Sequence, residues 1–224
     1  MKQIVKMIVK RGALIVVEGV DRSGKSTQCK KLVETLKEKG LNVKGFNFPD
    51  RTTAIGKVID EYLKESTSLS DEVIHLLFTA NRWEKMHEIK KSLTEGTTWI
   101  IDRYTYSGIV FSSIKKNMSL EWCKMPESGL PKPDLTFLLM VDDEALSQRP
   151  GFGNERYEKS EIQKKVKEMF SDMCTKEDTW KLVDANKPIK DVHDSMLQDI
   201  LKVIEGVKNR DLQYFDFINN RESQ

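Results

Sequence analysis

The sequence predicts an α/β fold in which helices cover both faces of a mostly parallel five-stranded sheet. Apolar runs such as "ALIVV" at 13–17 and "FLLMV" at 137–141 lack the alternation of a half-exposed strand, which indicates strands buried on both faces. Segments with helical spacing alternate with these runs, as the crossovers between parallel strands require. With 224 residues, the chain is long enough for one such domain and short for two.

The expected elements follow in order along the chain. The first strand, at 13–17, leads through a short loop to a helix that closes at Gly40. A second strand at 41–48 ends before Pro49. The other expected elements are helices at 52–66, 70–96, 161–173 and 189–207 and strands at 97–102, 133–141 and 180–185.

The helix at 70–96 is the longest of these elements. Ser70 can cap it and Gly96 can stop it. Phe78 and Arg82 lie four residues apart on one edge of this helix. A nucleobase could stack on Phe78 while Arg82 hydrogen-bonds its edge, but on spacing alone a core Phe78 and a solvated Arg82 are the simpler explanation. Beside this pair, an apolar stripe with helical spacing is expected to face the core: Val73, Leu76, Leu77, Ala80 and Trp83.

The composition argues against several classes of partner. The 37 Lys and Arg residues nearly balance the 35 Asp and Glu residues, so the net charge of +2 does not favour nucleic-acid binding. The longest apolar runs are far shorter than the roughly 20 residues of a membrane span. Cys29, Cys123 and Cys174 match neither a zinc site nor a disulfide framework. We therefore expect a cytoplasmic protein, with the nucleus as the alternative.

The stretch "GVDRSGKST" at 19–27 follows the first strand directly. Gly19, Gly24, Lys25 and Ser26 match the phosphate-loop pattern G-x-x-x-x-G-K-[ST]. Glycines let backbone N–H groups approach a polyphosphate, Lys25 would reach its β and γ oxygens, and the Ser26 hydroxyl would hold Mg²⁺. Because strand, loop and helix occur in the required order, the sequence predicts a three-layer P-loop NTPase fold.

Two strand ends carry further candidate residues. Asp102 ends the strand at 97–102, the Walker B position where a carboxylate helps to hold Mg²⁺, and its neighbour Arg103 is a candidate phosphate clamp. Arg51, in "FNFPDR" at 46–51, could grip an anion with two hydrogen bonds. Taken alone, a solvated arginine after a proline turn is the simpler explanation of Arg51.

A glycine-containing loop, "SQRPGFGNERYE" at 147–158, carries Arg149 and Arg156. Such a loop could close as a lid over a site of phosphoryl transfer, and a flexible surface loop is the alternative. Pro150 would stiffen a lid. His75 and the two other histidines show no metal-ligand spacing.

Six motifs in order and spacing together resemble the thymidylate kinase family: "GVDRSGKSTQ", "FPDR", "LLFTANRWE", "DRYTYSG", "SGLPKPDL" and "GFGNERYE". The resemblance covers about 11–207 and is strongest to the eukaryotic and poxviral branch, because Arg22 stands inside the phosphate loop. It implies transfer of the γ-phosphoryl group of ATP to dTMP with Mg²⁺, giving dTDP and ADP for dTTP biosynthesis. It also implies a homodimer formed through helices, in which Val58, Leu76 and Trp83 could serve the core or the interface equally.

The resemblance implies a role for each matching residue. Asp21 would bind the sugar 3′-hydroxyl, Arg22 the transferring phosphoryl group, and Arg51 and Arg103 the acceptor phosphate. The expected catalytic residues are Asp21, Arg22, Lys25 and Arg103. Phe78 would stack on thymine, Arg82 would hydrogen-bond its carbonyl edge, Tyr157 would crowd the 2′ position, and Arg149 would pack on adenine. Further residues are implied in the dTMP site (Phe48, Ser107, Gly108 and Gln163), in the ATP site (Gly19, Ser23, Gly24 and Thr27) and in the metal site (Ser26 and Asp102).

The expected organisation is a short extension at 1–10, one P-loop kinase domain at 11–208 with its lid at about 142–158, and a tail at 209–224. A GTPase switch would need N-K-x-D, but "NKPI" at 186–189 has isoleucine in the last position. A deoxynucleoside kinase is the nearer alternative. Its hydroxyl acceptor needs a general base, whereas this chain offers Arg51 at the end of the second strand.

Overall fold

The computed structural model describes residues 10–147 and 155–219. Its sheet is five-stranded and parallel throughout, with the strand order β2-β3-β1-β4-β5. The predicted fold class and the five strands are therefore confirmed. The strands are β1 (Leu14–Gly19), β2 (Val43–Asn47), β3 (Thr98–Asp102), β4 (Leu135–Met140) and β5 (Trp180–Asp184).

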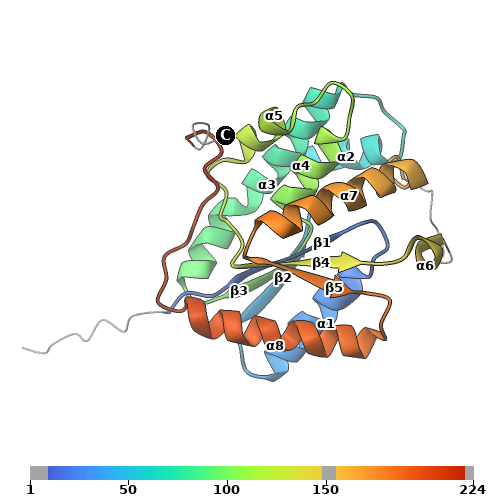
Figure 1. Cartoon of the computed structure of the whole chain (residues 1–224). Helices are drawn as coiled ribbons and strands as arrows, with labels where there is room; N and C mark the ends of the chain where they lie inside the picture. Colours follow the sequence, from blue (N-terminus) through green and yellow to red (C-terminus); the bar gives the residue numbers. More distant parts are fainter. Residues whose placement is uncertain (1–9, 148–154, 220–224) are drawn as a thin grey trace, which may run out of the picture.

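Helices cover both faces of the sheet (Figure 1). Helices α1 and α8 lie together on one face, and α3, α4 and α7 lie on the other. No helix in the described part of the chain is long and apolar enough to cross a membrane. The helical elements are α1 (Lys25–Glu38), α2 (Ala54–Leu63), α3 (Asp71–Thr94), α4 (Thr105–Ser113), α5 (Leu120–Lys124), the 3₁₀ helix η1 (Met125–Glu127), α6 (Asp143–Ser147), α7 (Ser160–Lys176) and α8 (Ile189–Val207).

The capping residues and apolar spacing in the sequence predicted several helix ends correctly. Ser70 caps α3 by accepting a hydrogen bond from the Val73 backbone N–H at 3.4 Å, and α8 has the predicted bounds. Helix α4 was not predicted, because "TYSGIVFSS" is rich in β-branched residues and serine and contains Gly108, which favour other conformations. Its first turn depends on a partner from another element, the Glu18 carboxylate of β1.

The predicted core face of α3 is wrong at Val73, Leu76 and Trp83, whereas Leu77 is half-buried and packs against the cluster that contains Ile74. Val73, Leu76 and Trp83 are 44%, 45% and 39% exposed. The side of α3 that faces the domain is more polar than expected, which explains the error: a stripe chosen by hydrophobicity does not find a buried face rich in hydrogen-bonding groups. The buried residues of α3 are Ile74, His75, Thr79, Asn81, Arg82, Met86, Ile89, Ser92 and Leu93.

The segment at 211–219, expected as part of a tail, packs against the domain (Figure 1). Phe215 is buried in the main core cluster. Its backbone N–H donates to Leu130 O at 2.9 Å, and its carbonyl accepts from Gly129 N at 2.8 Å. The Phe217 backbone N–H donates to the Ser128 hydroxyl at 3.1 Å. This segment therefore fixes the stretch of chain that follows η1.

Candidate active site

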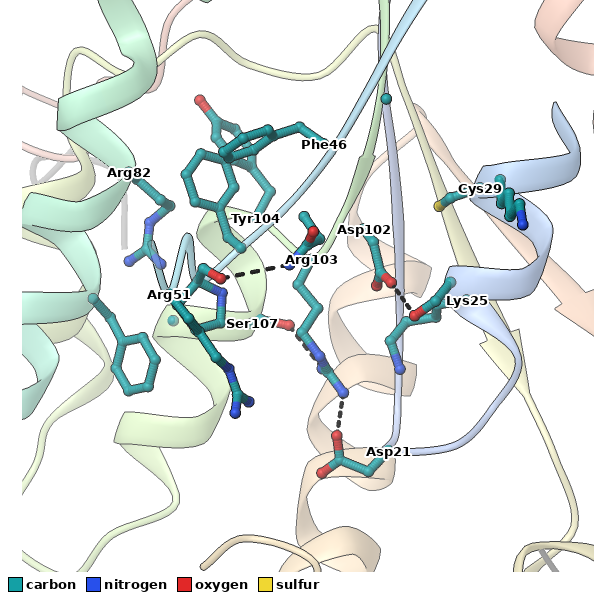
Figure 2. Close-up of a pocket in the computed structure, with 18 of the residues that line it drawn as sticks. Asp21, Lys25, Cys29, Phe46, Arg51, Arg82, Asp102, Arg103, Tyr104 and Ser107 are labelled. Carbon is teal, nitrogen blue, oxygen red and sulfur yellow. Dashed lines mark hydrogen bonds and ion pairs between the residues drawn. The ribbon is translucent and has the colours of Figure 1, made fainter. Parts of the chain in front are cut away.

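A pocket of about 710 Å³ opens at the carboxyl ends of β1, β2 and β3 (Figure 2). This is where a parallel α/β sheet offers a ligand site. Most of the predicted site residues line it: Asp21, Arg22, Lys25, Ser26, Phe48, Arg51, Phe78, Arg82, Asp102, Arg103, Ser107, Gly108 and Tyr157. Gly19, Ser23, Gly24 and Thr27 belong to the same phosphate loop and helix start but do not line the pocket, and Arg149 lies outside the described residues.

The phosphate loop joins β1 to α1 as its motif requires. Gly19, Arg22 and Gly24 have φ angles of 142°, 60° and 98°, in the region that favours glycine. A Cβ atom at Gly19 would lie 2.6 Å from Leu139 O, so only glycine fits there. Arg22 is not a glycine, so its backbone conformation is strained, a feature that clusters at functional sites.

Lys25 begins α1 and points into the loop. Its Nζ donates to Val20 O at 2.6 Å and is held 3.4 Å from the Ser23 hydroxyl. Burial lowers the pKa of Lys25 to about 8, and the nearby Arg103 charge acts in the same direction. A bound polyanion would restore the full positive charge, because an opposite charge favours the protonated form.

Ser26 and Asp102 meet at the candidate metal position. The Ser26 hydroxyl donates to Asp102 Oδ2 at 2.5 Å. Asp102 Oδ1 is buried and has no hydrogen-bond partner in the described part of the chain. Residues 10–147 and 155–219 contain no cluster of three His, Cys, Asp or Glu side chains that could hold a metal ion without other ligands. One hydroxyl and one carboxylate fit Mg²⁺, which usually takes its other ligands from phosphates and water.

Asp21 and Arg103 form an ion pair across the pocket (Figure 2). Burial alone would raise the pKa of Asp21, but the charges of Arg103 and Lys25 outweigh it and lower that pKa. Gln163 fixes Asp21 through two hydrogen bonds. Its amide oxygen accepts from the Asp21 backbone N–H at 2.8 Å, and its amide nitrogen donates to Asp21 Oδ2 at 2.6 Å. Gln163 thus contacts Asp21 rather than the pocket.

Arg103 has a φ angle of 63°, between the end of β3 and the start of α4. Its Nη1 donates to Gly19 O and to the Ser107 hydroxyl, both at 3.2 Å. The guanidinium also lies over the ring of Phe111, 5.4 Å from its centroid. Arg103 is thus aimed at the phosphate loop by several partners.

Glu18 is a buried residue beside the site that the sequence did not indicate. It is fully buried at the end of β1. Its Oε1 accepts from Tyr104 N at 2.9 Å and Ser107 N at 3.1 Å, and its Oε2 accepts from the Ser107 hydroxyl at 2.5 Å. Burial raises the pKa of Glu18, although these bonds and the Arg103 charge oppose the rise. A charged residue inside the run "ALIVVEGV" was the available signal, since buried carboxylates need partners.

Arg51 lies in the same part of the pocket as Arg103 (Figure 2). Its guanidinium contacts Asp60 Oδ1 at 2.7 Å and both carboxylate oxygens of Glu155, at 2.8 and 3.1 Å. It is not simply a solvated arginine. Because two carboxylates already hold it, its position suits an oxyanion that replaces one of them.

Arg82 and Phe78 line the far end of the pocket, on α3. Arg82 is only 2% exposed, which excludes the solvent-exposed side chain that its spacing alone favoured. Gly108 of α4 makes room for it, because a Cβ atom there would lie 2.3 Å from Arg82 Nη2. The absent side chain at Gly108 therefore admits the guanidinium to the pocket wall.

Tyr157 and Arg156 hold the carboxyl end of the loop at 147–158. The Tyr157 ring packs near Phe111 and Tyr62, and its hydroxyl lies 3.3 Å from the Tyr62 hydroxyl. Arg156 lies over the Tyr62 ring and donates to Tyr62 O and Thr67 O, both at 2.9 Å. Arg156 is therefore an anchor to the end of α2. Glu158 pairs with Arg22 of the phosphate loop at 3.2 Å.

Known proteins resemble this chain over most of its length. A family model described as thymidylate kinase matches residues 17–196. The thymidylate kinase of Danio rerio is 47% identical over 204 residues, 90% of this chain and 93% of that protein. The thymidylate kinase of Homo sapiens is 46% identical over 192 residues, 85% of this chain and 90% of that protein. The solved structure of the thymidylate kinase from Candida albicans matches with a TM-score of 0.79 and 41% identity, covering 92% of this chain and 99% of that chain.

The resemblance that the six motifs indicated is thus confirmed by sequence and by structure. The phosphate loop, the strand-terminal Asp102 and the pocket arginines lie within the matched residues 17–196. The chain belongs to the thymidylate kinase family.

Proposed function

We propose that this chain transfers the γ-phosphoryl group of ATP to dTMP, giving dTDP and ADP for dTTP biosynthesis. The arrangement of one pocket supports this: it joins a phosphate loop to two arginines suited to an acceptor phosphate and to an aromatic–arginine pair suited to a base. A phosphate monoester is already an oxyanion near neutral pH, since its second pKa is about 6. Catalysis then needs alignment and charge neutralisation rather than a general base.

The residues around the phosphates have separate roles in the proposed reaction. Arg51 and Arg103 hold the acceptor phosphate, which replaces Glu155 on Arg51. Lys25 and Arg22 neutralise charge on the transferring group. The backbone of the loop (Gly19, Ser23 and Gly24) and the adjacent Thr27 surround the donor phosphates. Arg149 packs on the adenine.

The acceptor nucleoside has its own set of contacts. Asp21 binds the 3′-hydroxyl, and Gln163 keeps Asp21 in place. Phe78 stacks on thymine, with Phe48, Ser107 and Gly108 as the neighbouring wall. Arg82 donates to the carbonyl edge of the base, and Tyr157 crowds the 2′ position and so favours deoxyribose.

Ser26 and Asp102 would hold Mg²⁺, which would neutralise charge on the phosphates of ATP. Direct nucleic-acid binding is not part of this proposal, since the net charge is only +2. A cytoplasmic location, with the nucleus as the alternative, belongs to the proposal as well.

Arg51 distinguishes the monophosphate kinase from a deoxynucleoside kinase. Arg51→Ala removes a charge-assisted contact worth about 1.5–3 kcal/mol, so kcat/KM for dTMP should fall roughly 10- to 150-fold. Steady-state kinetics with dTMP and with thymidine as acceptors would measure this, with the exposed Arg210→Ala as the matched control. Wild-type protein that prefers thymidine, or an Arg51→Ala variant unchanged toward dTMP, would overturn the assignment.

The pKa of Lys25 predicts how the reaction depends on pH. The pKa in the folded protein is lowered to about 8, so Lys25 of the free enzyme is charged below that pH and loses its proton above it. kcat/KM for ATP should therefore be level between about pH 7 and pH 8, where the phosphates are also ionised, and decline by up to about tenfold per pH unit above about pH 8. Lys25→Arg should remove the decline, because arginine stays charged. The same decline in both proteins would show that another group titrates.

We also propose a homodimer that buries the exposed apolar face of α3. Val73, Leu76 and Trp83 share that face, and Val58 is exposed on the neighbouring α2. An apolar stripe with helical spacing that faces outward indicates a partner surface. Sedimentation velocity should give a dimer for the wild type and a monomer for Leu76→Glu. A wild-type monomer at micromolar concentration would contradict the proposal.

A further inference from the structure

Glu127 is a fully buried carboxylate that the proposed reaction does not use. It ends the 3₁₀ helix η1 and is not among the residues that line the pocket. A buried, charged carboxylate is costly unless it is paired and hydrogen-bonded. Its partners therefore indicate why it is there.

Two side chains of α3 bind both oxygens of this carboxylate. The Thr79 hydroxyl donates to Glu127 Oε1 at 2.6 Å, and Arg82 Nε donates to Oε2 at 2.9 Å. Arg82 Nη2 forms the second bond of the ion pair, to Oε1. Two parallel N–H···O bonds along one side of a guanidinium fix its plane as well as its position.

This arrangement leaves one edge of Arg82 for a ligand. No hydrogen bond of Arg82 Nη1 occurs within the described residues 10–147 and 155–219, whereas Nε and Nη2 are both engaged by Glu127. Arg82 lines the pocket, and Figure 2 shows its guanidinium pointing into it. The backbone of Gly108 packs against the guanidinium, and a Cβ atom at Gly108 would lie 3.0 Å from Nη1. The guanidinium is thus held between Glu127 and the backbone of α4.

Glu127 is itself held by parts of the chain far from it in sequence. The residues after η1 are bonded to the segment at 211–219: Gly129 N donates to Phe215 O at 2.8 Å, and Phe215 N donates to Leu130 O at 2.9 Å. The Ser128 hydroxyl accepts from Phe217 N at 3.1 Å. These bonds fix the chain next to Glu127, so the carboxylate can hold Arg82 in one position.

We propose that Glu127 is a positioning residue for base specificity, because it fixes Arg82 so that Nη1 donates to the carbonyl at position 4 of thymine. This rests on the proposed function of Arg82 in base recognition. Cytosine has an amino donor at that position, so a fixed Nη1 would face another donor and both would stay unpaired. An arginine free to change rotamer could move away from the amino group, and the discrimination would weaken.

Glu127→Gln tests this, because glutamine keeps the shape but cannot accept both arginine bonds. We expect kcat/KM for dTMP to fall about 10- to 100-fold, mainly through KM, and the dTMP/dCMP ratio of kcat/KM to fall by about tenfold or more. KM for ATP should stay the same. Glu88→Gln is the matched control, since Glu88 is a surface glutamate of α3 paired with Lys44 and Lys85. A dTMP/dCMP ratio equal to that of the wild type would overturn the inference.

A second variant keeps the test valid if Glu127→Gln does not fold. Glu127→Asp retains the charge but shortens the reach, so its dTMP/dCMP ratio should lie between those of the wild type and Arg82→Ala, with KM for ATP unchanged. A purely structural role would lower stability, measured by thermal unfolding, without changing the ratio. An unchanged ratio in Glu127→Asp would therefore also contradict the inference.

Arg82→Ala separates failure of this inference from failure of the proposed function. If Arg82→Ala keeps the dTMP/dCMP ratio, Arg82 does not recognise the base, and the proposed function of that residue fails together with the inference. If Arg82→Ala abolishes the ratio while Glu127→Gln preserves it, only the role of Glu127 is wrong. We expect the double variant Arg82→Ala with Glu127→Gln to have the same dTMP/dCMP ratio as Arg82→Ala alone.

Discussion

The buried carboxylate of Glu18 is the interaction on which the arrangement of the site depends. It stands at the end of β1, next to the phosphate loop, and accepts from the backbone N–H groups of Tyr104, the N-cap of α4, and of Ser107 in the first turn. A carboxylate at a helix N-terminus is favourable because the unpaired N–H groups and the helix dipole both favour negative charge. One side chain thereby joins the donor side of the pocket to the helix that carries Ser107 and Gly108.

The position of Arg103 depends on this contact between Glu18 and α4. Arg103 lies between the end of β3 and the start of α4 in a strained backbone conformation, φ 63°, that the neighbouring contacts must hold. Glu18 accepts the hydrogen of the Ser107 hydroxyl, which leaves the oxygen lone pairs to accept from Arg103. Asp21 then supplies the opposite charge. The guanidinium is in place before any phosphate binds, so less reorganisation is required during the reaction.

The sequence predicted the elements whose signals are local. The phosphate loop, the Ser70 cap and the bounds of α8 each depend on residues close together in the chain. Helix α4, Glu18 and Glu127 could not be predicted in this way, since their partners lie on other elements. The exposed face of α3 was misassigned for a related reason: its buried side carries His75, Asn81 and Arg82, and each of these makes hydrogen bonds to other elements. For Arg82, only the resemblance to a family indicated a role that spacing did not.

The role of Glu18 is tested most directly by kcat/KM for dTMP, measured at saturating ATP for Glu18→Gln and for the wild type. Glutamine can still accept from the α4 backbone, but its amide nitrogen cannot accept the Ser107 hydroxyl hydrogen, and the negative charge near Arg103 is lost. We expect a folded protein with kcat/KM lowered about 10- to 100-fold, the loss expected for one charge-assisted bond. A folded Glu18→Gln variant with the kcat/KM of the wild type would contradict this role.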